Sequence, residues 1–397
     1  MKSKVRNSTS QNWPRVKLGE LCNLVNGDAY RETDWSIEGV PIIRIQNLNN
    51  PDKPFNYWSG SLDGRVIVKP GDVLLAWSGT PGTSFGTHRW TRGIGILNQH
   101  IFRVDLDTAR IDPEWVVFSI NEQLQEMIGR AHGAVGLRHV TKGECESLPI
   151  LLPPLPEQRR LAARLREQMA EVERSRAAVQ AQLDAAQSLP AALLRAIFTS
   201  PTAQRWPRRR LGDVLETRND IIHPRNKPTG TATFVGLEHI EPNTGRQIGS
   251  IEIDKAEMTG RKAQFFKGDI VYGYLRPYLN KVWIAEFDGL CSVDQYVYQV
   301  NSELAVTPFV AWFMRSSTYL ERAPIGGSPG QLPRIRMDEV AATEINLPPR
   351  AEQKKIAARL DAELTAARTL TETLETRLAE IELLPAALLR QAFNPAN

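Results

Sequence analysis

One segment in the second half of the sequence gathers the side chains that commonly bind nucleic acid. Residues 272–281 read Tyr-Gly-Tyr-Leu-Arg-Pro-Tyr-Leu-Asn-Lys and follow a short apolar run. Arginine can donate two hydrogen bonds to guanine, asparagine can pair with adenine, and lysine can bind phosphate. The segment therefore predicts DNA contact; the alternative is a packed turn with exposed tips. The candidate contact residues are Tyr274, Arg276, Tyr278, Asn280 and Lys281.

The corresponding stretch of the first half, residues 77–90, is rich in glycine and hydroxyl side chains. Glycine lets a backbone approach phosphates or bases closely, and hydroxyl groups can bond to either. An ordinary surface loop is the alternative interpretation. The candidate DNA contacts are Ser78, Thr80, Thr83, Ser84, His88 and Arg89.

A second loop in each half carries cations among glycines, at residues 133–142 and 326–336. This composition suits a phosphate clamp, and the alternative is a turn that leads into an exposed strand. The run Arg208–Arg210 is interpreted as a solvated linker in preference to a reader, and it could still contact phosphate nonspecifically. The candidates in the two loops are Arg138, His139, Lys142, Gln331, Arg334 and Arg336.

The sequence contains no recognisable catalytic motif. The Asn-Pro-Pro-aromatic and Asp-Pro-Pro-aromatic tetrapeptides of amino-methyl transfer are absent, as is the phosphate-binding G-x-x-x-x-G-K-[ST] loop. Residues 252–255, Glu-Ile-Asp-Lys, come nearest to a nuclease motif. They lack its carboxylate two positions before the lysine, so they predict a charged strand. The six histidines have no metal-ligand or triad spacing. We therefore expect no catalysis, metal ion or cofactor in this chain.

Composition is that of an ordinary globular protein of several domains. The 397 residues are 42% hydrophobic and 24% charged, with a net charge of +4. Such mild basicity permits nucleic-acid binding but does not establish it. Three scattered cysteines predict neither a disulfide framework nor a zinc site. No stretch reaches the ~18 apolar residues of a membrane span, so we expect a cytoplasmic protein without membrane contact.

The chain repeats itself after 195 residues. Residues 152–165, Leu-Pro-Pro-Leu-Pro-Glu-Gln-Arg-Arg-Leu-Ala-Ala-Arg-Leu, return at 347–360 as Leu-Pro-Pro-Arg-Ala-Glu-Gln-Lys-Lys-Ile-Ala-Ala-Arg-Leu. The heptapeptide Leu-Pro-Ala-Ala-Leu-Leu-Arg occurs identically at 189–195 and 384–390. Because the offset is constant across this segment, it predicts two rods of equal length, each preceded by a domain of related but divergent sequence.

The elements that must position the candidate loops are short strands and helices. Apolar runs such as 73–77 and 270–272 predict strands, and the spacing in 114–128 and 308–320 predicts helices. We expect an α+β fold in which two homologous α/β domains are joined by two long helices. The predicted boundaries are 1–151 and 200–346 for the domains, with 152–199 and 347–397 for the helices.

Each predicted rod shows a heptad seam. Between residues 156 and 188 there is neither glycine nor proline after the first residue, and apolar side chains alternate at spacings of three and four. About 32 helical residues would give a rod of ~50 Å, and Pro190 and Pro385 are expected to interrupt the final turns. Because one such helix cannot bury its seam alone, we expect the two to pair as an antiparallel coiled coil with pseudo-twofold symmetry.

With these motifs in view, the whole chain resembles the specificity subunit of Type I restriction-modification systems. The resemblance implies two target-recognition domains that each read one half of a split double-stranded DNA site, and a coiled coil that sets their spacing. It also implies two modification (methyltransferase) subunits and two restriction (motor-nuclease) subunits as partners. S-adenosylmethionine, ATP and Mg are expected on those partners, and none on this chain.

The duplicated helix starts are candidate docking sites for two identical modification subunits. The alternative for these charged faces is simple solvation. The candidate residues are Glu157, Gln158, Arg160, Glu352, Gln353 and Lys355. Two other functions remain open: specificity for an adenine methyltransferase that lacks a restriction partner, and a scaffold whose domains bind proteins. A cryptic nuclease or methyltransferase is disfavoured by the missing motifs.

Overall fold

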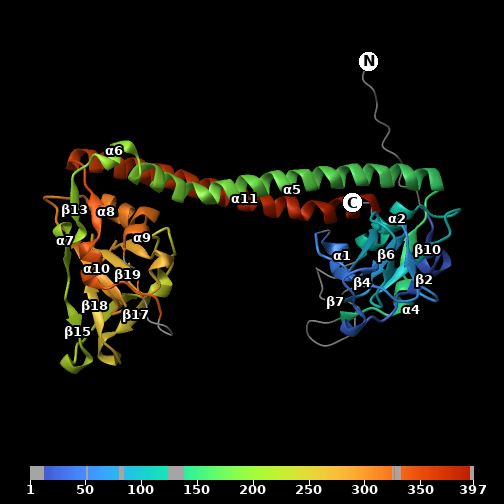
Figure 1. The fold of residues 1–397 in the computed structure, drawn as a ribbon, viewed down its shortest axis with the longest axis horizontal. Coiled ribbons are helices and arrows are strands. Elements are labelled where there is room, and N and C mark those ends of the chain that lie inside the picture. The colour runs from blue at the N-terminus through green and yellow to red at the C-terminus, as the bar shows by residue number, and fades with distance from the viewer. Residues whose placement is uncertain are drawn as a thin grey trace, which may run out of the picture. The chain divides into compact units, whose positions relative to one another are not determined.

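The computed structural model divides into two compact units (Figure 1). Unit 1 comprises Met1–Val179 and Arg377–Asn397, and unit 2 comprises Gln180–Thr376. The described residues are 13–50, 52–79, 85–123, 138–323, 326 and 332–393. Both units combine sheets with short helices, which confirms the α+β expectation.

Unit 1 is built on two four-stranded sheets and two two-stranded ribbons. The first sheet is antiparallel in the order β2-β10-β6-β8, and all four residues of β6 are buried because it is a central strand. The second has the order β4-β3-β9-β5, and the two ribbons pair β1 with β12 and β7 with β11. The strands are β1 (Arg15–Lys17), β2 (Cys22–Asn26), β3 (Val40–Ile43), β4 (Asn56–Trp58), β5 (Ile67–Val68), β6 (Val73–Ala76), β7 (Ser78–Gly79), β8 (Gly86–Arg89), β9 (Gly95–Leu97), β10 (Ile101–Leu106), β11 (Arg138–His139) and β12 (Pro149–Leu151).

Short helices complete unit 1. Helix α2 packs against β8 and begins with a capping aspartate, Asp112, whose carboxylate accepts hydrogen bonds from the backbone of Glu114 and Trp115. The predicted helix 114–128 is thus present, and its residues beyond 123 lie outside the described residues. The helices are η1 (Leu18–Glu20), η2 (Glu32–Asp34), α1 (Ile45–Asn49), α2 (Pro113–Glu122) and α4 (Lys142–Glu146).

Unit 2 repeats this plan with one additional strand in its second sheet. The order β14-β22-β19-β20 matches the first sheet of unit 1, and a five-stranded sheet β15-β18-β21-β16-β17 stands in place of the second. The predicted charged strand at 252–255 is confirmed, because it forms most of β17. The strands are β13 (Arg208–Arg210), β14 (Leu215–Thr217), β15 (Ile221–Ile222), β16 (Thr231–Val235), β17 (Ile251–Asp254), β18 (Lys262–Phe265), β19 (Ile270–Gly273), β20 (Val282–Ile284), β21 (Gly289–Ser292), β22 (Gln295–Val300) and β23 (Glu344–Asn346).

The helix predicted at 308–320 is two helices in the structure. Ser316 separates them because its hydroxyl accepts a hydrogen bond from the backbone of Tyr319 and so caps a new helix. The helices of unit 2 are α6 (Pro201–Gln204), α7 (Leu211–Val214), η3 (Pro224–Asn226), η4 (Leu237–His239), η5 (Lys255–Glu257), η6 (Pro277–Leu279), α8 (Thr307–Met314), α9 (Ser317–Arg322) and α10 (Met337–Ala342).

The two long helices, α5 (Leu155–Phe198) and α11 (Arg350–Phe393), each contain 44 residues and contribute segments to both units. Both continue through the prolines at 190 and 385, so the expectation that these prolines interrupt the final turns was wrong. A proline removes one backbone hydrogen bond. The residues beyond it nevertheless stay anchored, because Phe198 and Phe393 at the two helix ends are buried in unit 2 and unit 1 respectively.

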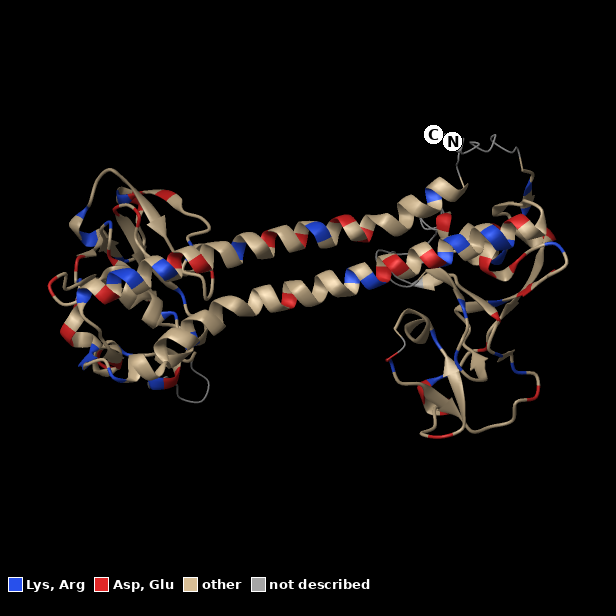
Figure 2. Cartoon of the chain, turned by 90° about the horizontal axis from the view of Figure 1, so that it is seen from above, with Lys and Arg blue, Asp and Glu red and all other residues tan. Residues whose placement is uncertain are grey.

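Within each unit, the start of one long helix packs beside the end of the other. In unit 1, Leu165 of α5 and Leu389 of α11 belong to one core cluster. In unit 2, Leu360 of α11 and Leu194 of α5 do the same. The segments therefore run antiparallel in each unit, as the seam predicted. Figure 2 shows Lys and Arg interleaved with Asp and Glu along both helices.

No helix in the described ranges has the length and apolarity that a membrane crossing requires. Over the same ranges, no cluster of three or more His, Cys, Asp or Glu side chains could hold a metal ion.

Candidate nucleic-acid interface

The two candidate loops of unit 2 lie against each other. Leu275 and Arg334 form an isolated antiparallel bridge. The backbone N–H of Arg276 donates to the carbonyl of Pro333 at 2.7 Å, and the N–H of Ile335 donates to the carbonyl of Tyr274 at 3.2 Å. Two segments about 60 residues apart in the sequence thus form one surface. We call residues 274–281 and 332–336 the unit 2 loop pair.

The first of these loops turns through two residues in the left-handed backbone region. Arg276 and Asn280 both have φ of 50°, on either side of η6. This conformation costs an ordinary side chain roughly 1–2 kcal/mol, while asparagine tolerates it better. The bond from Arg276 to Pro333 holds the turn at one end. At the other, the side-chain amide of Asn280 donates to the carbonyl of Arg315 at 2.6 Å. Such strain is found where a function needs a fixed geometry.

The turn presents cations and one aromatic ring to solvent. Arg276, Arg334 and Arg336 are exposed, and the Tyr278 side chain is 54% exposed. Guanidinium groups and tyrosine rings of this kind can bind phosphates, base edges and base faces. This set is the part of the predicted site that the structure brings together.

Other residues of the loop support the turn from beneath. The Tyr274 ring stacks on Tyr296 with centroids 4.3 Å apart, and partial burial raises the pKa of Tyr274. The ammonium group of Lys281 donates to the carbonyl of Leu237 at 2.5 Å. Asn280 is only 2% exposed. Its bond to Arg315 explains why asparagine stands there, so its placement favours a supporting role over adenine reading. Gln331 lies outside the described residues.

Sequence inspection missed the residues that hold this turn. Tyr296 lies on β22, opposite Tyr272 of β19 in the strand register, and the buried Arg315 follows α8. The local sequence of residues 295–298 is typical of a strand but does not reveal which strand it pairs with. No sequence signal pointed to Arg315.

Unit 1 brings the same two loops together by a short ribbon. β7 pairs with β11, and the N–H of Val140 donates to the carbonyl of Trp77 at 3.0 Å. We call residues 77–79 and 138–142 the unit 1 loop pair. Thr80, Thr83 and Ser84 lie outside the described residues, as do the side chains of Arg138 and His139.

The remaining candidates of unit 1 differ in exposure. Arg89 is exposed, and Lys142 forms an ion pair with Glu146 at 3.6 Å. Ser78 is 3% exposed. His88 lies on β8 opposite Leu74, where burial lowers its pKa. A half-buried imidazole is poorly placed to contact phosphate, and so is the buried hydroxyl group of Ser78.

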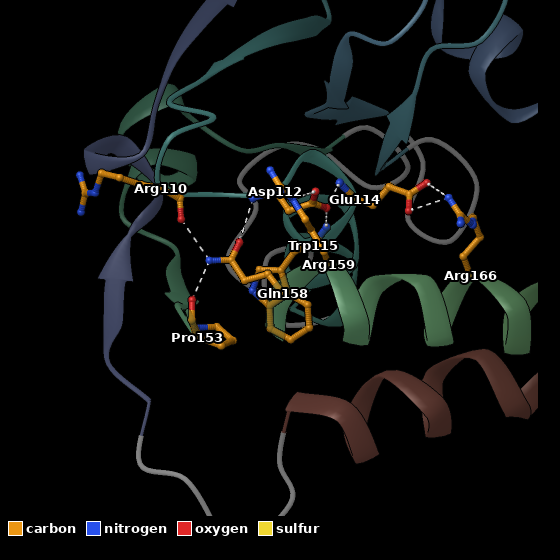
Figure 3. Close-up of polar contacts among 8 residues, drawn as sticks. All are labelled: Arg110, Asp112, Glu114, Trp115, Pro153, Gln158, Arg159 and Arg166. Atoms are coloured by element: carbon orange, nitrogen blue, oxygen red, sulfur yellow. Dashed lines mark hydrogen bonds and ion pairs between the residues drawn. The ribbon is translucent and has the colours of Figure 1, made fainter. Parts of the chain in front are cut away.

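The candidate docking residues fall into two groups. Glu157 and Arg160 form a surface ion pair at 2.6 Å, which lowers the pKa of Glu157 through the bond that Arg160 donates. Their counterparts Glu352 and Lys355 are exposed. Gln158 and Gln353, by contrast, are fully buried and bonded within the chain (Figure 3 shows Gln158). The structure therefore explains the repeated glutamine by internal bonding in place of the predicted docking.

Two copies of one α+β domain, each with a loop pair and each followed by a long helix, define a duplicated binding protein. The chain belongs to the family of the Type I restriction modification DNA specificity domain, whose model matches residues 10–179 and 204–383.

Characterised relatives align over nearly the full chain. The Type I restriction enzyme EcoDI specificity subunit of Escherichia coli is 24% identical, over 96% of this chain and 88% of its own. The EcoBI specificity subunit of the same organism is 20% identical, over 97% and 86%.

Two solved structures share the fold. One chain comes from the structure described as "Structural basis underlying complex assembly and conformational transition of the type I R-M system". It has a TM-score of 0.71 and 19% identity, with 96% of this chain and 97% of that chain covered. The HsdS subunit from Thermoanaerobacter tengcongensis has a TM-score of 0.62 and 18% identity, with 99% of both chains covered.

Proposed function

We propose that this specificity subunit reads a bipartite, asymmetric site in double-stranded DNA, one half with each unit. The observation that carries the proposal is the unit 2 loop pair, where two distant segments converge to expose Arg276, Arg334, Arg336 and Tyr278. The unit 1 loop pair occupies the corresponding place with different side chains. Because scaffold and placement repeat while the sequences of the loops differ, we infer two different half-sites.

We further propose that α5 and α11 act as a spacer of fixed length. Both contain 44 residues, and a straight α-helix of that size measures about 66 Å. The gapless duplication supports this role, since one inserted residue would lengthen a helix and also rotate its end by about 100°.

Assembly with partner subunits completes the proposal. Two modification subunits would dock at the duplicated helix starts, where Glu157 with Arg160 and Glu352 with Lys355 are accessible on equivalent turns. Two restriction subunits would join through them. On this proposal the methyl donor S-adenosylmethionine and the ATP and Mg of restriction are bound by the partners. The chain itself provides specificity without catalysis, in the cytoplasm.

Mapping adenine methylation tests this function. The chain is co-expressed with its modification subunit in a host without adenine methylation, and N6-methyladenine is mapped by single-molecule sequencing. We expect one split, asymmetric motif with a fixed spacer, which disappears when this chain is omitted. A stable complex that methylates no motif would contradict the specificity role and favour a scaffold. Methylation without any cleavage of unmodified DNA, even with the restriction subunit present, would indicate a system that only modifies.

A further inference from the structure

The buried glutamine at the start of α5, Gln158, makes three hydrogen bonds through its carboxamide. Its oxygen accepts from the backbone N–H of Asp112 at 2.8 Å, and its nitrogen donates to the carbonyls of Arg110 and Pro153 at 3.0 and 2.8 Å. Gln158 is 0% exposed. Figure 3 shows the carboxamide reaching both the segment before α2 and the segment before α5. One side chain thus ties the long helix to the recognition domain.

The element that Gln158 binds is itself an anchor of unit 1. Asp112 caps α2, and Trp115 in its first turn is fully buried. The Trp115 indole donates to the carbonyl of Leu151 at 2.8 Å, and its ring lies 4.4 Å from that of Phe393 at the end of α11. Both long helices therefore contact the start of α2. We call this arrangement the unit 1 joint.

Unit 2 contains the same joint at corresponding atoms. The Gln353 oxygen accepts from the N–H of Val306, the residue that precedes α8, at 2.8 Å. Its nitrogen donates to the carbonyls of Leu304 and Pro348 at 3.2 and 2.8 Å. Gln353 is 0% exposed, and Phe309 of α8 packs edge-to-face on Phe198 at 5.5 Å.

Polar contacts about two helical turns beyond Gln158 and Gln353 differ between the two units. In unit 1, Arg166 forms an ion pair with Glu114 at 2.9 Å. In unit 2, the equivalent helix position is Asp361, which accepts a hydrogen bond from the Trp312 indole at 2.8 Å. The two domains differ in these polar contacts to the helices, but both have the buried glutamine and the aromatic pair. Stability alone does not require identical joints, because different contacts can stabilise two domains equally well.

We propose that Gln158 and Gln353 are positioning residues that fix the orientation of each recognition domain on its helix, and that they thereby determine the spacer length between the two half-sites. The inference rests on the proposed function and deepens it. A carboxamide is needed because the pocket offers one N–H donor and two carbonyl acceptors. A carboxylate of the same size accepts the first bond but repels both carbonyls, so the joint loosens without a change in volume.

The test compares Q158E, Q353E and the double variant in the complete methyltransferase complex. Q182E is the matched control, because Gln182 is an exposed residue of α5 that undergoes the same change in charge. A plasmid library carries both half-sites with spacers from two base pairs shorter to two longer than the native one. The readout is the ratio of methylation at altered spacers to methylation at the native spacer, with circular dichroism and complex formation measured in parallel.

We expect each single variant to raise this ratio about tenfold while both half-site sequences stay the same, and the double variant to raise it further. Q182E should match the wild type. A folded variant that loses activity uniformly at all spacers, or that keeps the wild-type ratio, would overturn the inference. If a variant misfolds, the other glutamine provides the same test in its own unit. Absence of any motif in the wild-type complex would instead contradict the proposed function.

Discussion

The joints and the loop pairs of the two units have diverged to different degrees. Each joint has a buried glutamine bonded to three backbone groups and an aromatic pair at the far helix end. The loop pairs share their placement and an antiparallel backbone contact, but one is a strand ribbon and the other is a strained turn with exposed arginines. Duplication left the two copies free to vary independently. The comparison therefore indicates where the function needs the two halves to be equal and where it needs them to differ.

Truncating the aromatic residue of each joint gives the largest expected effect. Trp115 and Phe309 are fully buried, and removing such a side chain costs about 3–5 kcal/mol in transfer and cavity terms. We expect W115A to destabilise unit 1 and F309A to destabilise unit 2 by similar amounts. Limited proteolysis with mass mapping, performed on the full chain, would assign the first cleavages to a unit. Equal sensitivity of both units in either variant would contradict the separation into two units.

Removing one exposed arginine should affect only the half-site that the unit 2 loop pair reads. R276A removes a candidate bidentate contact from unit 2, and such contacts contribute about 1–3 kcal/mol of base discrimination. We expect methylation to fall about 10- to 100-fold and the motif to relax in one half only. The control is R174A, which removes an exposed arginine from α5. Relaxation of both halves, or of neither, in the methylome would show that Arg276 does not read a half-site.

Charged side chains at the helix starts should matter for assembly and little for folding. An exposed pair such as Glu157–Arg160 contributes only about 0–1 kcal/mol to stability. We therefore expect R160E to leave thermal unfolding nearly unchanged and to weaken binding of one modification subunit, with K355E acting on the other. Native mass spectrometry would then detect complexes that lack one such subunit. Full assembly of both variants would remove these residues from the docking surface.

The sequence predicted the parts of this fold that depend on local pattern. The heptad seam predicted both helices, and apolar runs predicted strands such as the one within residues 73–77. The proline expectation failed at Pro190, because tertiary burial of Phe198 holds the helix beyond it. The loop residues were selected by their chemistry, but their exposure was not predictable. Asn280 is buried by its bond to Arg315, a residue 35 positions away whose proximity depends on tertiary packing.

The joints show a further reason why function is harder to predict than fold. The repeated Glu-Gln pair was visible in the sequence, and a shared partner was a reasonable explanation for it. The two side chains point to different environments, however: Glu157 faces solvent and Gln158 faces the backbone of its own domain. Adjacent residues on a helix lie about 100° apart, so a dipeptide motif can serve two purposes at once.

Acidification should change the stability of the central sheets of the two units differently. We expect this effect to be smaller than those of the substitutions at Trp115, Arg276 and Arg160. On β8 of unit 1, His88 lies opposite Leu74, while Trp283 of β20 lies opposite Val271 at the corresponding place in unit 2. Burial lowers the pKa of His88 in the folded state, so the unfolded chain binds the proton more readily. The stability that depends on the neutral ring is therefore complete well above pH 6.5, the ordinary value, and is lost as the pH falls through that value toward the folded pKa. The slope is at most about 1.4 kcal/mol per pH unit for one group.

We expect H88L to flatten this dependence in unit 1 and to leave unit 2 unchanged, as followed by hydrogen exchange between pH 7.5 and 5.5. An equal loss of protection in both units of the wild type would show that carboxylate protonation, and not His88, dominates the acid response.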